Sequence, residues 1–285
     1  MDCGVSVSLF LFLEKICKSS IFLEFYGKKF WATVGFGDVE SANIVGYTQK
    51  DAPKGQFKIY GAGFEQVGGG SAVNGLVSGV EGVSYDEENV FRTTAAQIQI
   101  PNAEGGYDVY YYLNDGWFDD NGADGYKAGW CDDNGVIVDT EVTPGVAFWF
   151  KSVPSDAMCT VSGQVSLDTS AEVTCPQNFA LRANPFPVSV AVNSGKFASS
   201  DIVGVNYDEE NVFRTTAPQI QIPNAEGGYD VCYYLTDGWF DDNGADGYKA
   251  GWCDDNGVIV DTEIPAGQGI WTKGVTGAFT LTFTK

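Results

Sequence analysis

The sequence predicts an all-β protein made of two tandem β-sandwich-like domains with little helix. Three observations lead to this fold class. The 285 residues include 36 glycines, many of them in Asn-Gly and Asp-Gly pairs that are typical of tight turns. Short runs rich in β-branched and aromatic residues alternate with these turns. A long stretch of the sequence occurs twice, and at about 100 to 200 residues per domain the length agrees with two domains.

The internal duplication sets the expected domain boundaries. Tyr85–Glu141 and Tyr207–Glu263 align without gaps at an offset of 122 residues. A repeat of this length is a whole domain rather than one solenoid turn of about 20 to 50 residues. We therefore expect one domain over residues 38–165 and a second over residues 166–285. The two stretches differ at only three positions, Ala96/Pro218, Tyr110/Cys232 and Asn114/Thr236.

Runs that favour β-strands follow one another within each repeat, separated by turns. The turns contain Pro-Asn, Asn-Gly and Pro-Gly pairs, which fix φ near about −65° or tolerate a positive φ. Only residues 71–80 have a spacing that supports one helical turn. In the first repeat the expected strands include Gln56–Tyr60, Gln97–Ile100, Tyr110–Tyr112, Val136–Val138 and Val146–Phe150. Alternation places Tyr110 and Tyr112 on one face of their strand and Tyr111 on the other.

Residues 1–37 differ from the rest of the chain. Val5–Leu13 is an apolar run with the length of a signal-peptide core. We expect residues 1–37 to be an export signal or a wrongly assigned start of the reading frame, the alternative being an amphipathic segment packed on the body. Charged residues follow the run, so no apolar stretch reaches the about 18 residues that a membrane-spanning helix needs.

The composition excludes several classes of function. With 38 acidic and 16 basic residues, the net charge of −22 repels phosphate backbones, and we expect no nucleic-acid partner. The absence of histidine excludes Ser-His-Asp and Cys-His nucleophiles and His-ligated zinc. Asp119 with Asp132 or Glu141 could form a glycosidase pair, but acidic residues are frequent enough for such pairs to arise by chance. We therefore expect a protein that is not an enzyme.

The seven cysteines do not repeat as a set. At the offset of 122, the correspondences are Cys131 with Cys253, Cys159 with Leu281, Cys175 with Pro53, and Cys232 with Tyr110. Cys159 is interpreted as a small buried hydrophobic residue. A disulfide between Cys232 and Cys253 is one alternative for the second repeat.

An acidic and aromatic segment in each repeat is the candidate ligand site. It runs over Asp115–Gly135 and again over Asp237–Gly257. Aromatic rings could stack on a sugar while Asp and Asn side chains bond to its hydroxyl groups, as in a carbohydrate-binding module. The candidate ligand-binding residues are Tyr111, Trp117, Tyr126, Trp130, Tyr233, Trp239, Tyr248 and Trp252.

The same segments carry the oxygen ligands that Ca²⁺ prefers, and calcium is the one cofactor that the sequence suggests. The spacing departs from an EF-hand loop because Ala123 occupies a ligand position. The alternative interpretation is that these Asp and Asn residues form turns beside glycine. The candidate calcium ligands are Asp119, Asp120, Asn121, Asp124, Asp132, Asp133, Asp241, Asp242, Asn243, Asp246, Asp254 and Asp255.

Four short segments carry a resemblance to a known family. They are Val39–Tyr47 with its V-G-Y ending, Thr143–Phe150 with P-G-x-x-F-W-F, Phe179–Phe186, and Phe279–Phe283 with T-x-T-F. Over residues 38–285 the chain resembles a family of exported bacterial β-repeat proteins that has no assigned activity. The resemblance implies export and a β fold, with no catalytic residues to transfer. The second repeat lacks a V-G-Y opening, which puts its first strand in doubt.

These observations together predict a secreted or cell-surface protein with a structural or adhesive role. The alternative is a carbohydrate-binding module that uses the aromatic and acidic segments with the help of calcium. The expected partner is a surface protein or a glycan. The oligomeric state and the means of anchoring stay open.

Overall fold

A computed structural model describes residues 20–25, 28–33, 45–68, 70, 72–115, 127–237 and 249–285 of the chain. Within these residues all regular elements are strands except three helices of four residues each, which confirms the prediction of an all-β protein with little helix. Inside the segment predicted to be an export signal or a wrongly assigned start, β1 (Ser20–Phe25) and β2 (Lys28–Thr33) form an antiparallel pair.

The first repeat forms two sheets. Its strands are β3 (Val45–Ala52), β4 (Phe57–Gly61), β5 (Val77–Ser78), β6 (Val83–Ser84), β7 (Gln97–Pro101), β8 (Tyr107–Asp115), β9 (Gly129–Cys131), β10 (Ala147–Lys151) and β11 (Ala157–Gln164). The larger sheet has the order β4-β10-β7-β8-β6, with β9 paired to β8, and the smaller sheet has the order β3-β11-β5. The helix α1 (Val73–Leu76) provides the single turn expected within residues 71–80, and α2 (Phe91–Thr94) precedes β7.

The second repeat has the same strand order in its larger sheet. Its elements are β12 (Ser170–Cys175), β13 (Ala180–Ala183), β14 (Val190–Ala191), β15 (Phe197–Ser200), β16 (Val205–Asn206), α3 (Phe213–Thr216), β17 (Gln219–Pro223), β18 (Tyr229–Asp237), β19 (Gly251–Cys253), β20 (Glu263–Ile264), β21 (Gly269–Lys273) and β22 (Phe279–Thr284). The larger sheet is β13-β21-β17-β18-β16 with β19 on β18, and the smaller ones are β12-β22-β15 and β14-β20. The first strand of this repeat, which the sequence left in doubt, is β12.

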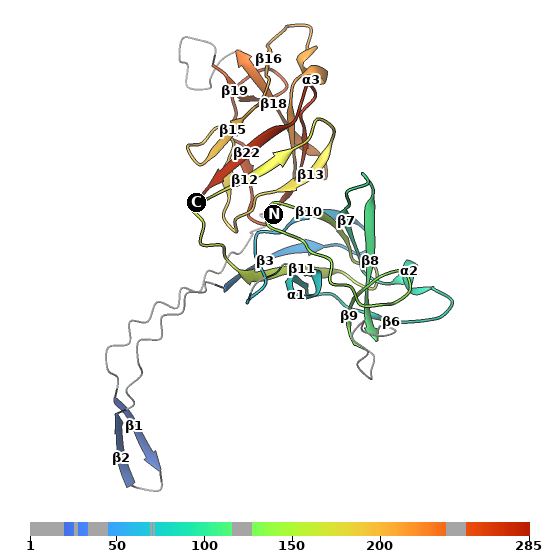
Figure 1. The fold of residues 1–285 in the computed structure, drawn as a ribbon, viewed down its shortest axis with the longest axis vertical. Helices are drawn as coiled ribbons and strands as arrows, with labels where there is room; N and C mark the ends of the chain where they lie inside the picture. The colour runs from blue at the N-terminus through green and yellow to red at the C-terminus, as the bar shows by residue number, and fades with distance from the viewer. Residues whose placement is uncertain are drawn as a thin grey trace.

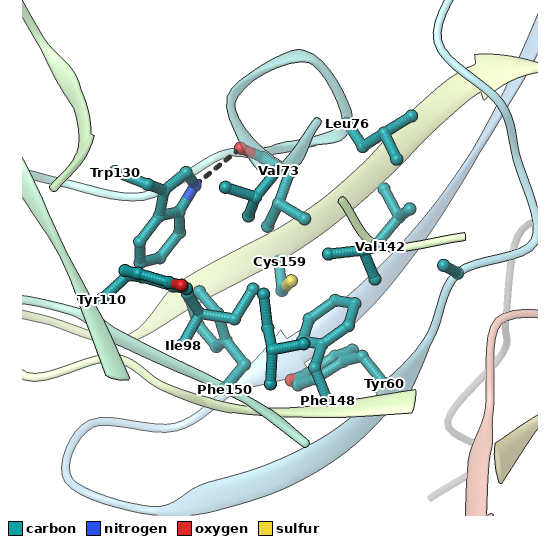
Figure 2. Close-up of a cluster of buried hydrophobic side chains, with 14 of the residues drawn as sticks. Tyr60, Val73, Leu76, Ile98, Tyr110, Trp130, Val142, Phe148, Phe150 and Cys159 are labelled. Atoms are coloured by element: carbon teal, nitrogen blue, oxygen red, sulfur yellow. Dashed lines mark hydrogen bonds between the residues drawn. The ribbon is translucent and has the colours of Figure 1, made fainter. Parts of the chain in front are cut away.

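In the first repeat, a hydrophobic core lies between the larger and the smaller sheet. Figure 2 shows Tyr60, Phe148 and Phe150 of the larger sheet pointing toward Cys159 of β11. The Trp130 indole is fully buried and donates a hydrogen bond to the Val77 carbonyl at 3.1 Å (Figure 2). Burying one large apolar side chain contributes about 1.5 to 3 kcal/mol, so this cluster is what holds the two sheets together.

Two local predictions need correction. Val136–Val138 does not form a strand: the Val136 amide bonds to the Asp132 carboxylate at 2.9 Å and the Val138 carbonyl to Asn74 at 2.6 Å, which leaves only one isolated bridge to β9. The helices α2 and α3 were not expected either. In α2, the Asp86 carboxylate accepts bonds from the amides of Val90 and Phe91 and so stabilises the first turn.

The strand pairing also corrects two inferences about cysteines. Cys175 pairs with Phe279, as Ala52 pairs with Ala157, so Cys175 corresponds to Ala52 and not to Pro53. The turn after β12 is one residue shorter than the turn after β3, which displaces the offset locally.

Cys253 pairs with Tyr233, so these two side chains lie on the same face of the sheet. Cys232 precedes Tyr233 on β18 and therefore points to the opposite face. The two thiols cannot form the disulfide that the sequence left as an alternative, and both are buried and free.

The two repeats contact each other through the β4 and β10 end of one larger sheet and the β13 and β21 end of the other (Figure 1). Ile59, Ala147, Leu181 and Ala183 form a buried cluster there. The offset of 122 relates Ile59 to Leu181 and also Trp149 to Trp271, and the rings of the two tryptophans lie 6.1 Å apart.

The hydrogen bonds across this contact follow the same relation. The Gly61 amide donates to the Gly267 carbonyl at 2.9 Å, and the Ala183 amide donates to the Gly145 carbonyl at 2.8 Å. At the offset of 122, the donor Gly61 corresponds to the donor Ala183, and the acceptor Gly145 corresponds to the acceptor Gly267. Equivalent positions thus meet each other, as they do in the isologous interface of a two-fold homodimer.

Candidate functional site

The predicted site residues lie in or beside the acidic segments, at the edge of each larger sheet that is away from the contact between the repeats. In each repeat, the segment begins at the end of β8 or β18 and contains β9 or β19, which pairs back onto that strand. The following predicted residues lie outside the described part of the chain: Trp117, Asp119, Asp120, Asn121, Asp124, Tyr126, Trp239, Asp241, Asp242, Asn243, Asp246 and Tyr248.

The structure assigns the two predicted tryptophans that it describes to the core. Trp130 is 0 % and Trp252 is 2 % exposed, so neither indole presents a face on which a ligand could stack. Each indole N–H is satisfied inside its repeat, by the Val77 carbonyl and by the Ser199 hydroxyl, both at 3.1 Å. A two-residue alternation along β9 would have been the sequence signal, but the strand is only three residues long.

The two predicted tyrosines lie on the other face of their strands. Tyr111 contacts the Phe91 ring edge-on at 5.5 Å, and Tyr233 contacts Phe213 in the same way at 5.4 Å. Burial raises the pKa of both phenols, so both stay protonated at neutral pH. The prediction that Tyr110 and Tyr112 face away from Tyr111 is confirmed, because both pack in the core between the sheets.

Asp132 and Asp254 form turns. The Asp132 carboxylate accepts bonds from the amides of Asn134 at 2.8 Å and Val136 at 2.9 Å. Asp254 makes the equivalent bonds at the same two distances. Gly135 closes the turn with a φ of 78°, which an L side chain rarely adopts. For these two residues the turn-forming interpretation describes what the carboxylates do.

Asp133 and Asp255 are each held by an arginine. The Arg92 side chain donates two bonds to the Asp133 carbonyl, at 3.0 and 2.5 Å, and lies 3.8 Å from its carboxylate. Arg214 holds Asp255 in the same way. The Arg92 side chain is 38 % and the Asp133 side chain 62 % exposed, so the ion pair itself contributes about 1 kcal/mol or less. The main effect of Arg92 is therefore to fix the position of the turn through its two bonds to the Asp133 carbonyl.

Neither arginine was among the residues predicted from the sequence. The only signal for them was that both lie within the nearly identical stretch. Together with the asparagine that bonds to the backbone of each tryptophan, they hold β9 or β19 and the turn that follows it.

The chemistry of the described site residues is that of carboxylates and neutral groups. Burial raises the pKa of the Cys131 and Cys253 thiols to about 12, so neither is a nucleophile at neutral pH. Among the described residues, no group of three or more Cys, Asp or Glu side chains could hold a metal ion. The remaining candidate calcium ligands lie within residues 116–126 and 238–248, outside the described part of the chain.

Comparison of the chain with known protein families, with curated proteins and with solved structures finds no match. In the part of the chain that the structure describes, no helix is long and apolar enough to cross a membrane.

Proposed function

We propose that the chain is a non-enzymatic structural or adhesion protein of the cell surface or the extracellular space. In this proposal two β-sandwich-like modules hold two equal binding ends apart. The carrying observation is that the repeats are joined at one end of each larger sheet, while the acidic segments start at the other end.

The strand order supports this arrangement. β4 and β10 make the contact between the repeats, whereas β8 and its partner β9 lie at the far side of the same sheet. In the second repeat, β13 and β21 make the contact, and β18 and β19 lie at the far side. β9 and β19 accordingly lie on opposite sides of the contact (Figure 1). Two equal ends that point apart suit the bridging of two partners better than the gripping of one.

The same arginine and asparagine contacts occur at both ends, which is an argument that the two ends have the same function. Arg92 and Arg214 hold the adjoining turns with the same bonds, and Asn74 and Asn193 bond to β9 and β19 in the same way. The stretches that these side chains bond to are identical in sequence, Asp115–Glu141 in the first repeat and Asp237–Glu263 in the second. Whatever ligand one end binds, the other end should bind as well.

The proposed partner is a glycan or a surface protein, and calcium would act by neutralising carboxylates of the acidic segments. Export is the expectation that the family resemblance adds. The net charge of −22 would keep such a protein hydrated and resist self-association.

The test is binding of the full chain to an array of immobilised glycans, in millimolar CaCl₂ and in EDTA, followed by clumping of beads coated with the best glycan. We expect Trp117→Ala and Trp239→Ala to leave binding but remove clumping, and the double variant to lose both. Leu167→Ala, an exposed apolar residue elsewhere, is the control. Clumping that survives either single substitution would contradict the two-ended arrangement, and no glycan binding at all would overturn the adhesive role for this class of partner.

A further inference from the structure

Four aromatic side chains, called the aromatic row below, lie in an unbroken series across the contact between the repeats. The Phe57 ring lies edge-on to Trp149, with the ring centroids 6.3 Å apart. Trp149 lies 6.1 Å from Trp271, and Trp271 lies 6.2 Å from Phe179. The offset of 122 relates Phe57 to Phe179 as it relates the two tryptophans, so the two halves of the row are equivalent.

The aromatic row lies on the outer face of each larger sheet. Phe148 and Phe150 belong to the core of the first repeat, so Trp149 between them points to the opposite face. Ile270 belongs to the core of the second repeat, so Trp271 points outward in the same way. The outer faces of the two sheets thus share one continuous line of rings.

The packing of the repeats against each other accounts for the two inner rings only. Trp149 and Trp271 pack on the buried cluster at the contact. Phe57 and Phe179 are not members of that cluster, and they are 40 % and 48 % exposed. Exposed apolar groups that continue a larger apolar surface mark a place where another molecule binds.

A lysine lies over each outer ring. The Lys151 ammonium is 5.2 Å from the Phe57 ring centroid, and the Lys273 ammonium is 5.1 Å from that of Phe179. Within the described ranges, neither lysine forms an ion pair with a carboxylate. The two ends of the row are therefore positively charged, which disfavours a cationic ligand, while the net charge of −22 of the whole chain repels a polyanion.

Uncharged amides lie beside the inner rings. Gln99 pairs with Trp149 and Gln221 pairs with Trp271, so each glutamine lies on the same face of the sheet as its tryptophan. Both glutamines are partly exposed. A side-chain amide donates and accepts hydrogen bonds, as a sugar hydroxyl does. Apolar rings beside neutral amides suit a ligand that has apolar faces and hydroxyl groups at its edges.

We propose that the aromatic row binds an extended, uncharged glycan that lies across both repeats. The C–H faces of successive sugars pack against the four rings, and sugar hydroxyl groups bond to Gln99 and Gln221. This inference goes beyond the proposed function, because it assigns a second site that uses neither the acidic segments nor calcium.

The experiment is titration calorimetry of the full chain in EDTA with β-1,4-linked oligomers of glucose, mannose and xylose, each as a two-sugar and a six-sugar chain. We expect one site per chain for at least one of the three sugars. Its six-sugar form should bind at least about tenfold more tightly than its two-sugar form, because only the longer chain reaches all four rings. No binding of any six-sugar oligomer would overturn the proposal.

A six-sugar galacturonate and a proline-rich peptide test the two other classes of ligand that an aromatic surface with flanking lysines could hold. We expect both to bind more weakly than the best neutral oligomer. Raising the salt concentration should leave the affinity for the neutral oligomer unchanged, since no charge is paired. Tighter binding of the galacturonate or of the peptide would contradict the assignment to an uncharged glycan.

Paired substitutions of the outer rings test the location. Phe57→Ala with Phe179→Ala should weaken binding of the six-sugar chain by at least about fivefold. The unfolding midpoint in urea should change little, because both rings lie outside the buried cluster. Phe57→Tyr with Phe179→Tyr keeps the rings and should keep the affinity. Unchanged binding in the double alanine variant would overturn the proposal.

Two further double variants serve as controls. Val90→Ala with Val212→Ala changes an equivalent pair of exposed side chains elsewhere, each 51 % exposed, and should leave the affinity unchanged. Trp117→Ala with Trp239→Ala, which tests the proposed function, should also leave binding of the neutral oligomer in EDTA unchanged. The failure of one proposal is thereby distinguished from the failure of the other, and loss of binding in this variant would contradict a separate site.

Discussion

At the scale of single residues, Lys50 is the clearest case of a charge in an unusual place. It lies on β3, opposite Cys159 on β11, and its ammonium donates to the Gln268 side chain of the other repeat at 2.7 Å. Burial lowers its pKa to about 7, and the titrating group that partly offsets this is the Cys159 thiol, which burial itself keeps neutral. The charged form of Lys50 therefore has no buried anion to offset its desolvation.

This environment predicts a pH dependence of stability. In the unfolded chain Lys50 titrates near 10.5, so between pH 7 and that value the unfolded state binds more protons than the folded state. The contribution of Lys50 to the free energy of unfolding therefore becomes less favourable as the pH falls toward 7, and it stays constant below pH 7. We expect the stability gained by Lys50→Met to be roughly 2 to 3 kcal/mol larger at pH 6 than at pH 9. Urea unfolding at both values measures it, with exposed Lys54→Met as control; equal gains would refute the shifted pKa.

At the scale of elements, one asparagine in each repeat joins three segments. The Asn74 carboxamide accepts from the Trp130 amide at 2.6 Å and donates to the Val138 carbonyl at 2.6 Å. Asn193 makes the same contacts with Trp252 and Val260. The two asparagines lie 119 and not 122 residues apart, so a gapless alignment does not pair them. The shared triplet Ala-Val-Asn, of which each asparagine is the last residue, was the available signal.

Removing this brace should loosen the end of the sheet that bears the acidic segment. We expect Asn74→Ala to lower the free energy of unfolding by about 1 to 2 kcal/mol, since its bonds are partly accessible to water. The Trp130 amide should then exchange its hydrogen faster than in the wild-type chain, and Asn193→Ala should do the same at Trp252. Asn178→Ala, at an exposed bend, is the control. An unchanged exchange rate at Trp130 would show that the brace does not hold β9.

The elements that could be predicted from the sequence are those that depend on residues close to one another in the chain. Alternation and turn pairs predicted the strands at Gln97–Ile100 and Val146–Phe150, which appear as β7 and β10. The failure at Val136–Val138 has a different origin, because a distant side chain, Asn74, takes the carbonyl that a strand partner would need. The prediction for the site failed for a similar reason. The sequence predicted that Trp130 binds a ligand, but in the structure its side chain is buried against α1 and β5, which are distant in sequence.

At the scale of the whole molecule, the contact between the repeats shows how duplicated surfaces can differ where they meet. Gly61 faces Ala183, its own counterpart at the offset of 122, and Ala147 likewise faces Gly269. In each pair one member is alanine and the other glycine. A Cβ on Gly61 would lie 2.6 Å from the Ala183 Cβ, so each pair has room for one methyl group only. A strictly symmetric pair of alanines would not fit.

This complementarity can be measured by exchanging the two residues. Gly61→Ala should destabilise the chain by about 1 to 3 kcal/mol through overpacking, and Ala183→Gly by about 1 kcal/mol through greater freedom of the unfolded chain. The double variant moves the methyl group to the other repeat. Since the main clash of the first change is with the Ala183 Cβ, we expect the double variant to recover most of the loss, with a coupling energy of about 1 to 2 kcal/mol in urea unfolding.

Gly277→Ala is the matched control for the exchange, because a Cβ at Gly277 meets no atom within 4 Å. It should leave the unfolding midpoint within error of the wild-type chain. A coupling energy together with an unchanged control would show that the repeats are packed as tightly as the Gly61 and Ala183 geometry requires. The distance between the two proposed binding ends would then be set by that packing rather than by the connection between β11 and β12. Strictly additive effects of the two substitutions would instead mean that the repeats can separate to make room for the extra methyl group.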